Sequence, residues 1–464
     1  MSLLRERVGE ELYERIVHLD RIRASRVADE TLRAPDAAVA TDTDVVFAGG
    51  GLSTLIAAAV AARGRRVVVC ERAKAGVAHR EWNASEAELR ALVDGAIVAE
   101  PELARMVVAR YRYGTCQFYP GPRYEVRRVL DYAVDAGELL RHVRTIAEAR
   151  GVVFLDRAEV CGIGAGSTAV RVAYKEAGAQ RELIASLVVD ARGASSPYAS
   201  ADLVCPTVGG VMREIRVGEG PKEMDPEVGE ILTTTEGIHE GRQHVWEAFP
   251  GKTGETSVYL FYYANRGESG TLEALYERFF QEIRNYKDGE PTLVRPTFGY
   301  IPGWSRLTPP PRSPSPRVIL VGDAAARHSP LTFCGFGAML RSFAPAANAI
   351  DAALSGHGIA GQSIVHDTEL HGFTGPLAKL MAGHGFQGNE LNELLDAAFR
   401  TLHEQGDETF GRLLRDEMGA NEFYRFLIAT SKKRPRVYRE VFRDLGFASV
   451  ATWGKHLARE LWRA

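Results

Sequence analysis

The chain has 464 residues, a formal net charge of −3 and 45% hydrophobic residues, which is the composition of an ordinary globular protein. Its length predicts roughly two or three domains with sizeable cores, and its nearly balanced charge gives no sign of a nucleic-acid partner. The five cysteines are odd in number and none of their spacings suits a metal, so we expect neither a metal site nor a structural disulfide. We therefore expect a protein of a reducing compartment, such as the cytoplasm.

The sequence has no sign of a secretion signal or of a membrane span. Arg5, Glu6 and Arg7 put charge at the very start of the chain, where a signal peptide would become apolar. No apolar run approaches the roughly 20 residues that cross a membrane. Any contact with a membrane is therefore expected at its surface.

The first 40 residues carry apolar side chains at helical spacing. These are Leu4, Val8, Leu12, Ile16, Leu19 and Ile22. The spacing predicts an amphipathic helix, which either packs on the outside of the fold or serves as a functional arm.

A strand–helix–strand pattern begins at Asp44. Residues 45–48 and 67–70 predict two short buried strands, with an alanine-rich helix between them. Gly49 permits a tight turn, Gly51 lets the backbone approach a pyrophosphate, and Glu71 follows the second strand, where an acid binds ribose hydroxyls. The pattern predicts a dinucleotide site. Its expected cofactor-binding residues are Gly49, Gly51, Thr54, Glu71 and Arg72.

The middle of the chain is rich in strand-like runs. Residues 130–149 predict a helix, and residues 152–190 alternate like antiparallel strands. Gly162, Gly164 and Gly166 are spaced like a second nucleotide loop, but they stand between two strand-like runs, so we interpret them as a hairpin turn. Without a second nucleotide fold, a flavin would need an external reductant or a separate reductase.

A second motif follows a cluster of prolines. A buried strand at 318–321 leads to Asp323, and a loop then turns into a helix that begins near Ala338. This arrangement resembles the second FAD fingerprint of the glutathione-reductase-like flavoproteins, and the run 188–193 resembles their middle motif. The resemblance implies that Asp323 holds the ribitol and that the amides of 335–337 face the pyrimidine edge of the flavin. The cofactor-binding residues expected here are Asp323, Pro330, Gly335, Phe336 and Gly337.

These motifs predict an α/β fold. A Rossmann-like FAD-binding domain of the glutathione-reductase type is interleaved with a β-rich substrate domain and followed by C-terminal helices. The predicted segments are a helical extension at 1–40, the FAD-binding domain at 41–204 and 313–350, the β-rich substrate domain at 205–312, and a helical C-terminal region at 351–464.

Several further runs resemble the CruA/CruP-type lycopene cyclase family. They are Arg80–Asn83, Trp246–Pro250, Phe298–Trp304, Gly322–Gly337, Gly375–Leu377 and Asn392–Leu395. The resemblance extends from about residue 40 to about residue 415. It implies a two-domain FAD protein that closes the linear ends of lycopene into rings, by adding a proton, closing the ring through a tertiary cation and losing another proton. No net redox change occurs, so the flavin would act in its reduced form.

Four residues are candidates for the chemistry of the site. Glu81 and Glu247 each stand beside a tryptophan, where partial burial would raise the pKa of the carboxyl, so each is either a proton carrier or a structural acid. His328 either shuttles protons beside the flavin or caps its loop. Cys334 is either a reactive thiol at a helix N-terminus or a small buried side chain.

The expected substrate is apolar, a carotenoid such as lycopene. We expect an apolar tunnel that reaches the flavin and is lined from the segments around Trp82, Trp246, Phe298 and Phe336. From Lys432 onward the tail is basic and interleaved with aromatic residues, which fits either a helix at a membrane interface or a solvated surface.

The leading interpretation is a carotenoid-modifying flavoenzyme, a lycopene cyclase that acts as an isomerase. One alternative is a flavin monooxygenase or an isoprenoid reductase with an apolar substrate. Another is a non-catalytic protein that binds flavin or pigment.

Overall fold

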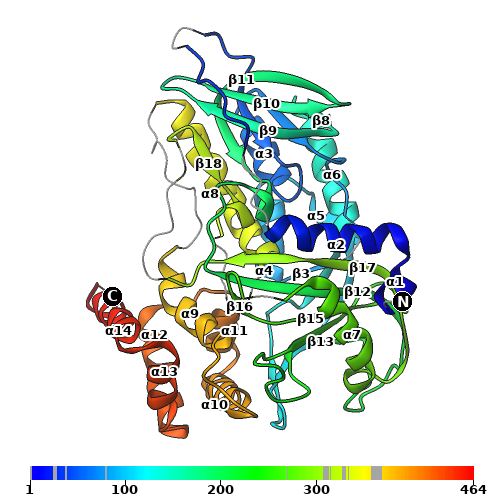
Figure 1. Ribbon diagram of the computed structural model, residues 1–464, viewed down its shortest axis with the longest axis vertical. Coiled ribbons are helices and arrows are strands. Elements are labelled where there is room, and N and C mark those ends of the chain that lie inside the picture. The colour runs from blue at the N-terminus through cyan, green and yellow to red at the C-terminus, as the bar shows by residue number, and fades with distance from the viewer. Residues whose placement is uncertain are drawn as a thin grey trace.

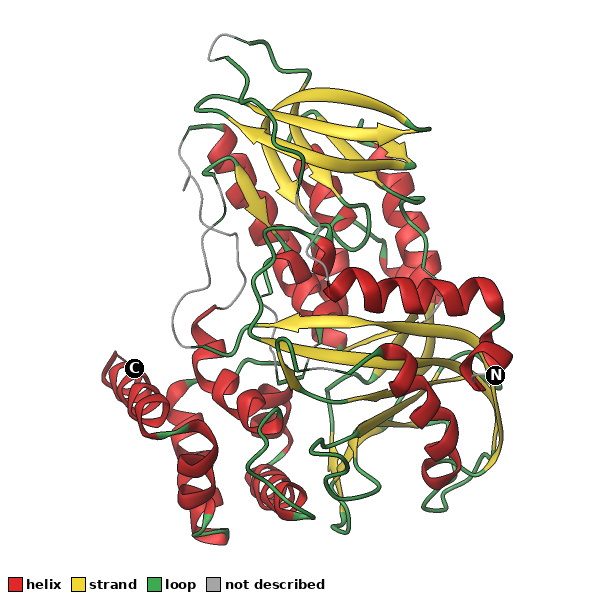
Figure 2. Ribbon diagram, viewed as in Figure 1, coloured by secondary structure: helices red, strands yellow, loops and turns green. Residues whose placement is uncertain are grey.

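The computed structural model describes most of the chain. The described ranges are 3–24, 29–36, 39–78, 81–268, 270–306, 313, 315–326, 331–332, 334–356 and 368–463. Figures 1 and 2 show a sheet backed by helices at the top, a second sheet below it, and a group of C-terminal helices beside the second sheet.

The first sheet has seven strands and is mainly parallel. Its order is β8 (Val153–Asp156), β2 (Val67–Glu71), β1 (Thr43–Ala48), β11 (Ala179–Asp190), β10 (Val170–Glu176) and β9 (Ala158–Ala165), with β18 (Val318–Leu320) also paired to β11. Pairs among β8, β2, β1, β11 and β18 are parallel, whereas β9, β10 and β11 form an antiparallel meander.

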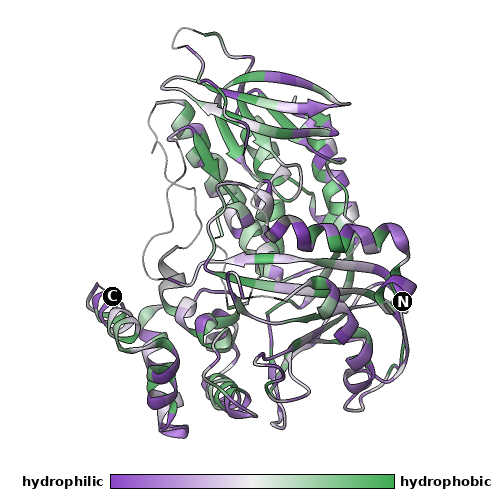
Figure 3. Cartoon of the chain, viewed as in Figure 1, coloured by the Kyte–Doolittle hydropathy of each residue, from purple (hydrophilic) through white to green (hydrophobic). Residues whose placement is uncertain are grey.

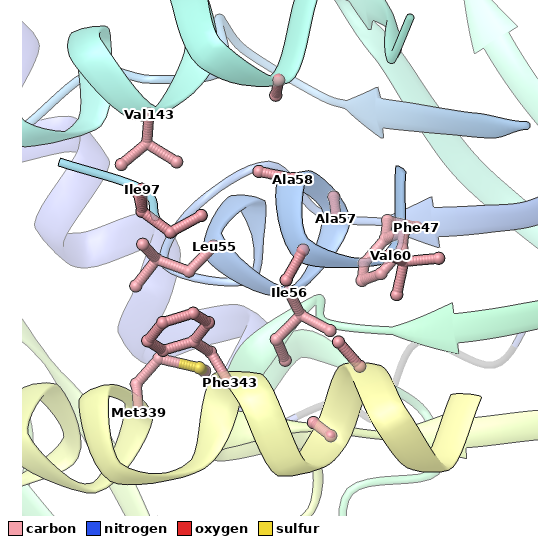
Figure 4. Packing of buried hydrophobic residues seen from close by; sticks show 14 of the residues in the cluster. Phe47, Leu55, Ile56, Ala57, Ala58, Val60, Ile97, Val143, Met339 and Phe343 are labelled. Carbon is pink, nitrogen blue, oxygen red and sulfur yellow. The ribbon is translucent and has the colours of Figure 1, made fainter. Parts of the chain in front are cut away.

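Helix α3 (Thr54–Ala61) is buried along its whole length because its side chains are small or apolar. It packs between α6 (Ala136–Ala149) and α8 (Gly335–Leu354), and Figure 4 shows Val143 of α6 on one side of it and Phe343 of α8 on the other. Hydrophobic residues accordingly run along the first sheet and along α3 and α8, whereas α2 (Glu10–Ala24) carries hydrophilic stretches (Figure 3).

The second sheet has eight strands. Its order is β16 (Ala264–Asn265), β12 (Leu203–Ile215), β15 (Thr256–Phe261), β14 (Val245–Pro250), β13 (Val228–Thr233), β5 (Tyr113–Gln117) and β6 (Arg123–Val126), with β17 (Gly289–Gly303) also paired to β12. Strands β5 and β6 belong to this sheet although their residues fall within the segment 41–204. A small third sheet consists of β3 (Glu81–Ala84), β7 (Tyr132–Asp135) and β4 (Val107–Arg110).

Each face of the second sheet is covered by helices. On one face, α7 (Leu272–Tyr286) packs on alternate side chains of β12, β14 and β15, and α1 (Leu3–Val8) and α2 lie against α7. The opposite face joins a core that also contains the C-terminal helices. These are α9 (Thr368–Met381), α10 (Glu390–Gln405), α11 (Asp407–Leu414), α12 (Ala420–Lys433), α13 (Val437–Leu445) and α14 (Phe447–Arg463). Helices α4 (Glu86–Asp94) and α5 (Glu100–Met106) contribute to the hydrophobic core that contains β1 and α3.

The N-terminal segment connects the two sheets. The predicted amphipathic helix is broken at Gly9, whose φ is +78°, so that α1 and α2 each pack an apolar face against α7. The chain then crosses to the first sheet, where Asp29 pairs with Arg192 at 2.7 Å. Residues 30–35 run so close to β9 that a Cβ at Gly162 would lie 2.9 Å from Leu32.

Two local expectations need correction. Strands β9 and β10 do form a hairpin, but Gly162 and Gly164 lie within β9, where they let the N-terminal segment approach. The helix expected at 130–149 begins only at Ala136, because Asp135 caps it by accepting a hydrogen bond from the Glu138 amide at 2.9 Å. The residues before it form β7.

Strand β12 requires glycine at its centre. Gly209 has a φ of +137°, and a Cβ there would overlap the carbonyl oxygen of Val258. Gly209→Ala should lower the free energy of unfolding by at least about 1–3 kcal/mol, the usual contribution of a strained backbone. Gly299→Ala in β17 is the matched control, because a Cβ there has no neighbour within 4 Å.

Urea unfolding followed by circular dichroism measures both variants. Equal midpoints for the two variants would show that β12 and β15 do not approach each other as closely as described.

Candidate functional site

The carboxyl ends of four parallel strands meet at one edge of the first sheet. The register pairs Ala48 of β1 with Cys70 of β2 and with Asp190 of β11, and Asp190 with Leu320 of β18. Ligands of open α/β sheets bind at such an edge. The edge brings together the turn at 49–51, Glu71 and the start of the second fingerprint.

In the turn after β1, the space beside Gly49 is filled by backbone, whereas the space beside Gly51 is empty. Gly49 has a φ of +114°, and a Cβ there would overlap the carbonyl oxygen of Ala191. Gly51, in contrast, has nothing within 4 Å of a Cβ position. The Gly51 and Leu52 amides donate to no acceptor in the described part of the chain, so both are available to an anion at the N-terminus of α3.

Glu71 is held rigidly beside this turn. Its carboxylate accepts hydrogen bonds from the Gly50 amide at 2.8 Å and from the Ala73 amide at 2.9 Å. Thr54 is fully buried and donates to the Gly50 carbonyl at 3.1 Å, so it stabilises the turn, whereas Arg72 is exposed at the edge of the sheet.

The second fingerprint lies at the same edge. Asp323 stands in a short 3-10 turn, Gly322–Ala324, which packs against the turn Gly193–Ser195 after β11. Asp190 closes that turn by accepting hydrogen bonds from Arg192 at 2.8 Å and from Ser196 at 2.7 Å. His328, Pro330 and Arg80 lie outside the described residues.

Two glycines at the N-terminus of α8 differ in the space that surrounds them. A Cβ at Gly335 meets nothing within 4 Å, whereas a Cβ at Gly337 would overlap the carboxylate of Glu88. Phe336 is buried and packs against Trp82 of β3, with ring centroids 5.1 Å apart. The structure therefore brings together two of the four aromatic residues expected around a tunnel.

Trp246 and Phe298 do not face this region. Trp246 stacks on Tyr286 with centroids 4.9 Å apart, and Phe298 lies 6.3 Å from Tyr276, so both pack against α7. The expectation that they line a tunnel is therefore wrong. Alternation along β14 directs Trp246 to one face of the sheet and Glu247 to the other.

Glu247 is a largely buried acid that has no hydrogen-bond partner in the described part of the chain. Its side chain keeps some accessible surface although every neighbour from 243 to 250 is buried, and its carboxylate has no hydrogen-bond partner among the residues that the structure describes. Burial raises the pKa of Glu247 to about 8, so the group is mainly neutral at pH 7. The sequence-based expectation of a raised pKa is confirmed for this residue.

Several groups connect Glu247 to the loop before α8. Tyr259 pairs with it across β14 and β15, and Tyr263 donates a hydrogen bond to the Leu331 carbonyl. Burial, and after it the nearby Glu247 carboxyl, raises the pKa of the Cys334 thiol to about 12. The Cys334 thiol is therefore protonated at pH 7, and we interpret the side chain as a small packing residue rather than a reactive thiol. Period-two alternation along β15 could have identified Tyr259 from the sequence, whereas Tyr263 lies just after the end of that strand.

Glu81 has the features of a structural acid. It is 4% exposed, accepts a hydrogen bond from Ser257 at 3.3 Å and lies 4.0 Å from Arg295. It thus joins the third sheet to β15 and β17, on the face of the second sheet that also carries Glu247.

Neither a metal site nor a membrane-spanning helix is found in the described part of the chain. Within the described ranges, no group of three or more His, Cys, Asp and Glu side chains is arranged to hold a metal ion. In the same ranges, no helix is both long and apolar enough to cross a membrane.

Solved structures with this fold include the halogenase PltM, with a TM-score of 0.60, 14% identity and coverage of 90% of this chain and 96% of that one. The chain has the fold of the FAD-dependent flavoproteins. A geranylgeranyl bacteriochlorophyll reductase-like protein from Thermoplasma acidophilum has a TM-score of 0.54 at 16% identity, covering 86% of this chain and 98% of its own. A flavoprotein/dehydrogenase from Cytophaga hutchinsonii has a TM-score of 0.57 at 14% identity, covering 86% and 96%.

These similarities confirm the predicted fold class. One PltM structure contains FAD and phloroglucinol. No protein-family model matches the sequence, and no curated protein matches it. Membership of the lycopene cyclase family therefore stays a prediction.

The pKa of Glu247 has a consequence for stability. Below its ordinary value of 4.5 the carboxyl is protonated in both the folded and the unfolded chain, and its stabilising contribution is complete. As the pH rises to about 8, the unfolded chain releases the proton before the folded chain does, so this contribution is lost. Glu247→Gln, which imitates the neutral acid, should escape this loss.

Urea unfolding of both proteins between about pH 5 and pH 8.5 tests this expectation. The stability of the parent relative to the Gln variant should fall by up to about 1.4 kcal/mol per pH unit in this window. A constant difference would contradict the raised pKa.

Proposed function

We propose that this chain binds FAD without a covalent link and is an enzyme that acts on an apolar substrate. The residues present fit the cofactor, because the turn at Gly51 and the start of α8 at Gly335 are open where a Cβ would project. Unpaired amides at the N-terminus of α3 suit a pyrophosphate, and the fixed carboxylate of Glu71 suits ribose hydroxyls. Asp323 lies at the same edge and would hold the ribitol.

The observation that carries the proposed chemistry is the neutral, unpartnered carboxyl of Glu247. A group that is protonated near pH 7 and has no competing acceptor is suited to give a proton to a substrate. Reduced FAD, when bound, would supply a negative charge that stabilises a cation in a region of low dielectric constant. Tyr259 and Tyr263 would add aromatic stabilisation of roughly 0.5–2 kcal/mol each.

We infer that the reaction is ring closure of an acyclic carotene such as lycopene. Glu247 would give its proton to a terminal double bond, a neighbouring double bond would close the ring on the tertiary cation, and loss of a ring proton would restore a double bond. The product has the mass of the substrate. Glu81 is the weaker candidate for proton carrier because Ser257 and Arg295 already engage it.

An isoprenoid reductase or a flavin monooxygenase is the second candidate function. The similarity to a geranylgeranyl reductase-like protein and to halogenases favours it, because these folds serve redox chemistry in those proteins. Either reaction would consume reducing equivalents from an external reductant or reductase. A non-catalytic protein that binds flavin or pigment is the third.

FAD binding is tested by filling the open side of the turn. Gly51→Trp should fold normally, since its Cβ has no neighbour within 4 Å, but it should lose nearly all its flavin. Gly51→Ala is the matched control and should keep most of it. Acid precipitation releases the flavin, which chromatography then quantifies. A flavin content in Gly51→Trp equal to that of the parent would show that FAD does not bind at this turn.

The proton carrier is tested in lycopene-producing cells. Glu247→Gln should lower cyclisation by about 10²–10⁴-fold, the usual contribution of general acid catalysis, while flavin content stays unchanged. Glu81→Gln should retain more activity. Pigment chromatography measures the cyclic carotenes that each variant produces. If the Glu247→Gln variant cyclises lycopene at the parent's rate, Glu247 is not the proton carrier. If the parent protein itself leaves lycopene unchanged although its flavin is reduced, the protein is not a cyclase and the alternative functions are favoured.

We also propose that α13 and α14 contact a membrane surface. Phe447 and Trp462 are 77% and 92% exposed, which suits an interface, and Lys432, Arg439 and Lys455 have no acidic partner among the residues described. Most other basic residues of the tail pair with acids, in part from α10, so the attraction should be modest.

Cosedimentation with phosphatidylglycerol vesicles measures this contact. The double variant Phe447→Ser, Trp462→Ser should bind several-fold more weakly than the parent, whereas Tyr119→Ser, which removes an exposed aromatic from the turn between β5 and β6, should bind normally. Equal binding of all three proteins would contradict the proposal.

A further inference from the structure

An apolar cavity of about 240 Å³ lies among the C-terminal helices α9 to α14. None of the residues that line it carries a charge, and most of them are leucine, valine, methionine or phenylalanine. Protein interiors rarely enclose a space much larger than a water molecule. Engineered apolar cavities of about 150 Å³ exclude water and bind small hydrocarbons instead. A cavity of this size and composition is therefore suited to an apolar ligand.

The polar side chains of the wall offer an occupant almost nothing to bind. Ser431 already donates a hydrogen bond to the Ile428 carbonyl at 2.8 Å. The hydroxyl of Thr430 and the indole N–H of Trp453 are fully buried, so a ligand in the cavity does not reach them. Tyr438 is exposed and lies at the protein surface. Because a polar group that loses water without gaining a partner is unfavourable, the cavity selects a hydrocarbon that carries no hydroxyl or carboxylate.

The outer end of the cavity lies at α13. Tyr438 and Phe442 of this helix line the cavity and are 55% and 41% exposed. Phe442 stacks on Phe447 at the start of α14, with ring centroids 6.2 Å apart, and Phe447 is itself 77% exposed. Exposed aromatic side chains thus lead from the protein surface to the cavity, so an apolar chain can enter there.

The inner end of the cavity approaches the surroundings of Glu247. Leu331, from the loop before α8, is buried and lines the cavity. Its carbonyl accepts a hydrogen bond from the hydroxyl of Tyr263. Burial, then Cys205 and then Glu247 raise the pKa of Tyr263 above its ordinary value, so the tyrosine is close enough to Glu247 to sense its charge. Tyr263 therefore connects the wall of the cavity to the region of the proposed proton carrier.

We propose that this cavity binds the end of a long isoprenoid chain that carries no polar group, while another part of the same chain lies at Glu247. The identity of the chain rests on the proposed function, whereas the hydrocarbon character of its end rests on the cavity alone. An acyclic carotene has a bare hydrocarbon at both ends, so the cavity holds the end that is not reacting. Hydroxylation or oxidation of that end then belongs to an enzyme that acts after this one.

Equilibrium dialysis of the purified flavin-containing protein with two labelled probes tests the cavity. Hexadecanol has one bare end, whereas hexadecanediol has a hydroxyl at each end, so the parent should bind hexadecanol at least about tenfold more tightly. Most of this preference should disappear in Val450→Trp, which fills the cavity from α14, and in Ala398→Phe, which fills it from α10. Thr452→Trp is the matched control, because it adds the same bulk at an exposed position of α14 outside the lining.

The control should bind both probes as the parent does, and an undiminished preference in both filled variants would overturn the proposal. Squalene, an isoprenoid hydrocarbon with two bare ends, should displace hexadecanol from the parent. If squalene does not displace it, the cavity binds straight lipid chains and the isoprenoid assignment is overturned.

Pigment analysis separates this proposal from the proposed function. In lycopene-producing cells, Val450→Trp should lower cyclisation several-fold while its flavin content stays unchanged, because the far end of the substrate is displaced. Parental cyclisation in Val450→Trp and Ala398→Phe would overturn the placement of that end. Glu247→Gln should bind hexadecanol as the parent does. A parent protein that binds hexadecanol in the cavity but does not cyclise lycopene would reject the cyclase and support the cavity as a hydrocarbon site.

Discussion

The second sheet carries a packed core on each of its two faces, and this constraint decides where every side chain of its strands points. On β14, Trp246 enters the core under α7, and its neighbour Glu247 must then face the opposite way. On the apolar face under α7, Trp246 packs against Phe279 and Tyr286. The proposed chemistry therefore belongs to the opposite face, which carries Glu247.

Polar contacts join the second sheet and the residues after it to the loop before α8 and to the third sheet. The hydroxyl of Tyr263 reaches the Leu331 carbonyl, and Glu81 connects the third sheet to Ser257. Cys334 stands just before α8 and is close enough to Glu247 for that carboxyl to raise the pKa of the thiol, so the start of α8 approaches the face that carries Glu247. A partly accessible acid with a raised pKa at such a boundary is typical of a functional site rather than of a structural core.

The sequence predicted the features that depend on local pattern. The turn at Gly49, the acid at Glu71 and the strand before Asp323 follow from strand, glycine and acid spacing, and the fold class followed from their order. The tunnel assignment was wrong for Trp246 and Phe298 because a family resemblance identifies segments and not the faces of strands. The connection through Asp29 could not be predicted, since it depends on a contact between segments far apart in the chain.

The central claim is that Glu247 is a neutral acid near the start of α8. Infrared difference spectroscopy of the purified protein, titrated with alkali, measures it most directly through the C=O stretch of a protonated carboxyl. The account predicts a band that persists at pH 7, disappears with a pKa near 8 and is missing from Glu247→Gln. A spectrum without such a band above about pH 6, or a band that is unchanged in the Gln variant, would contradict it.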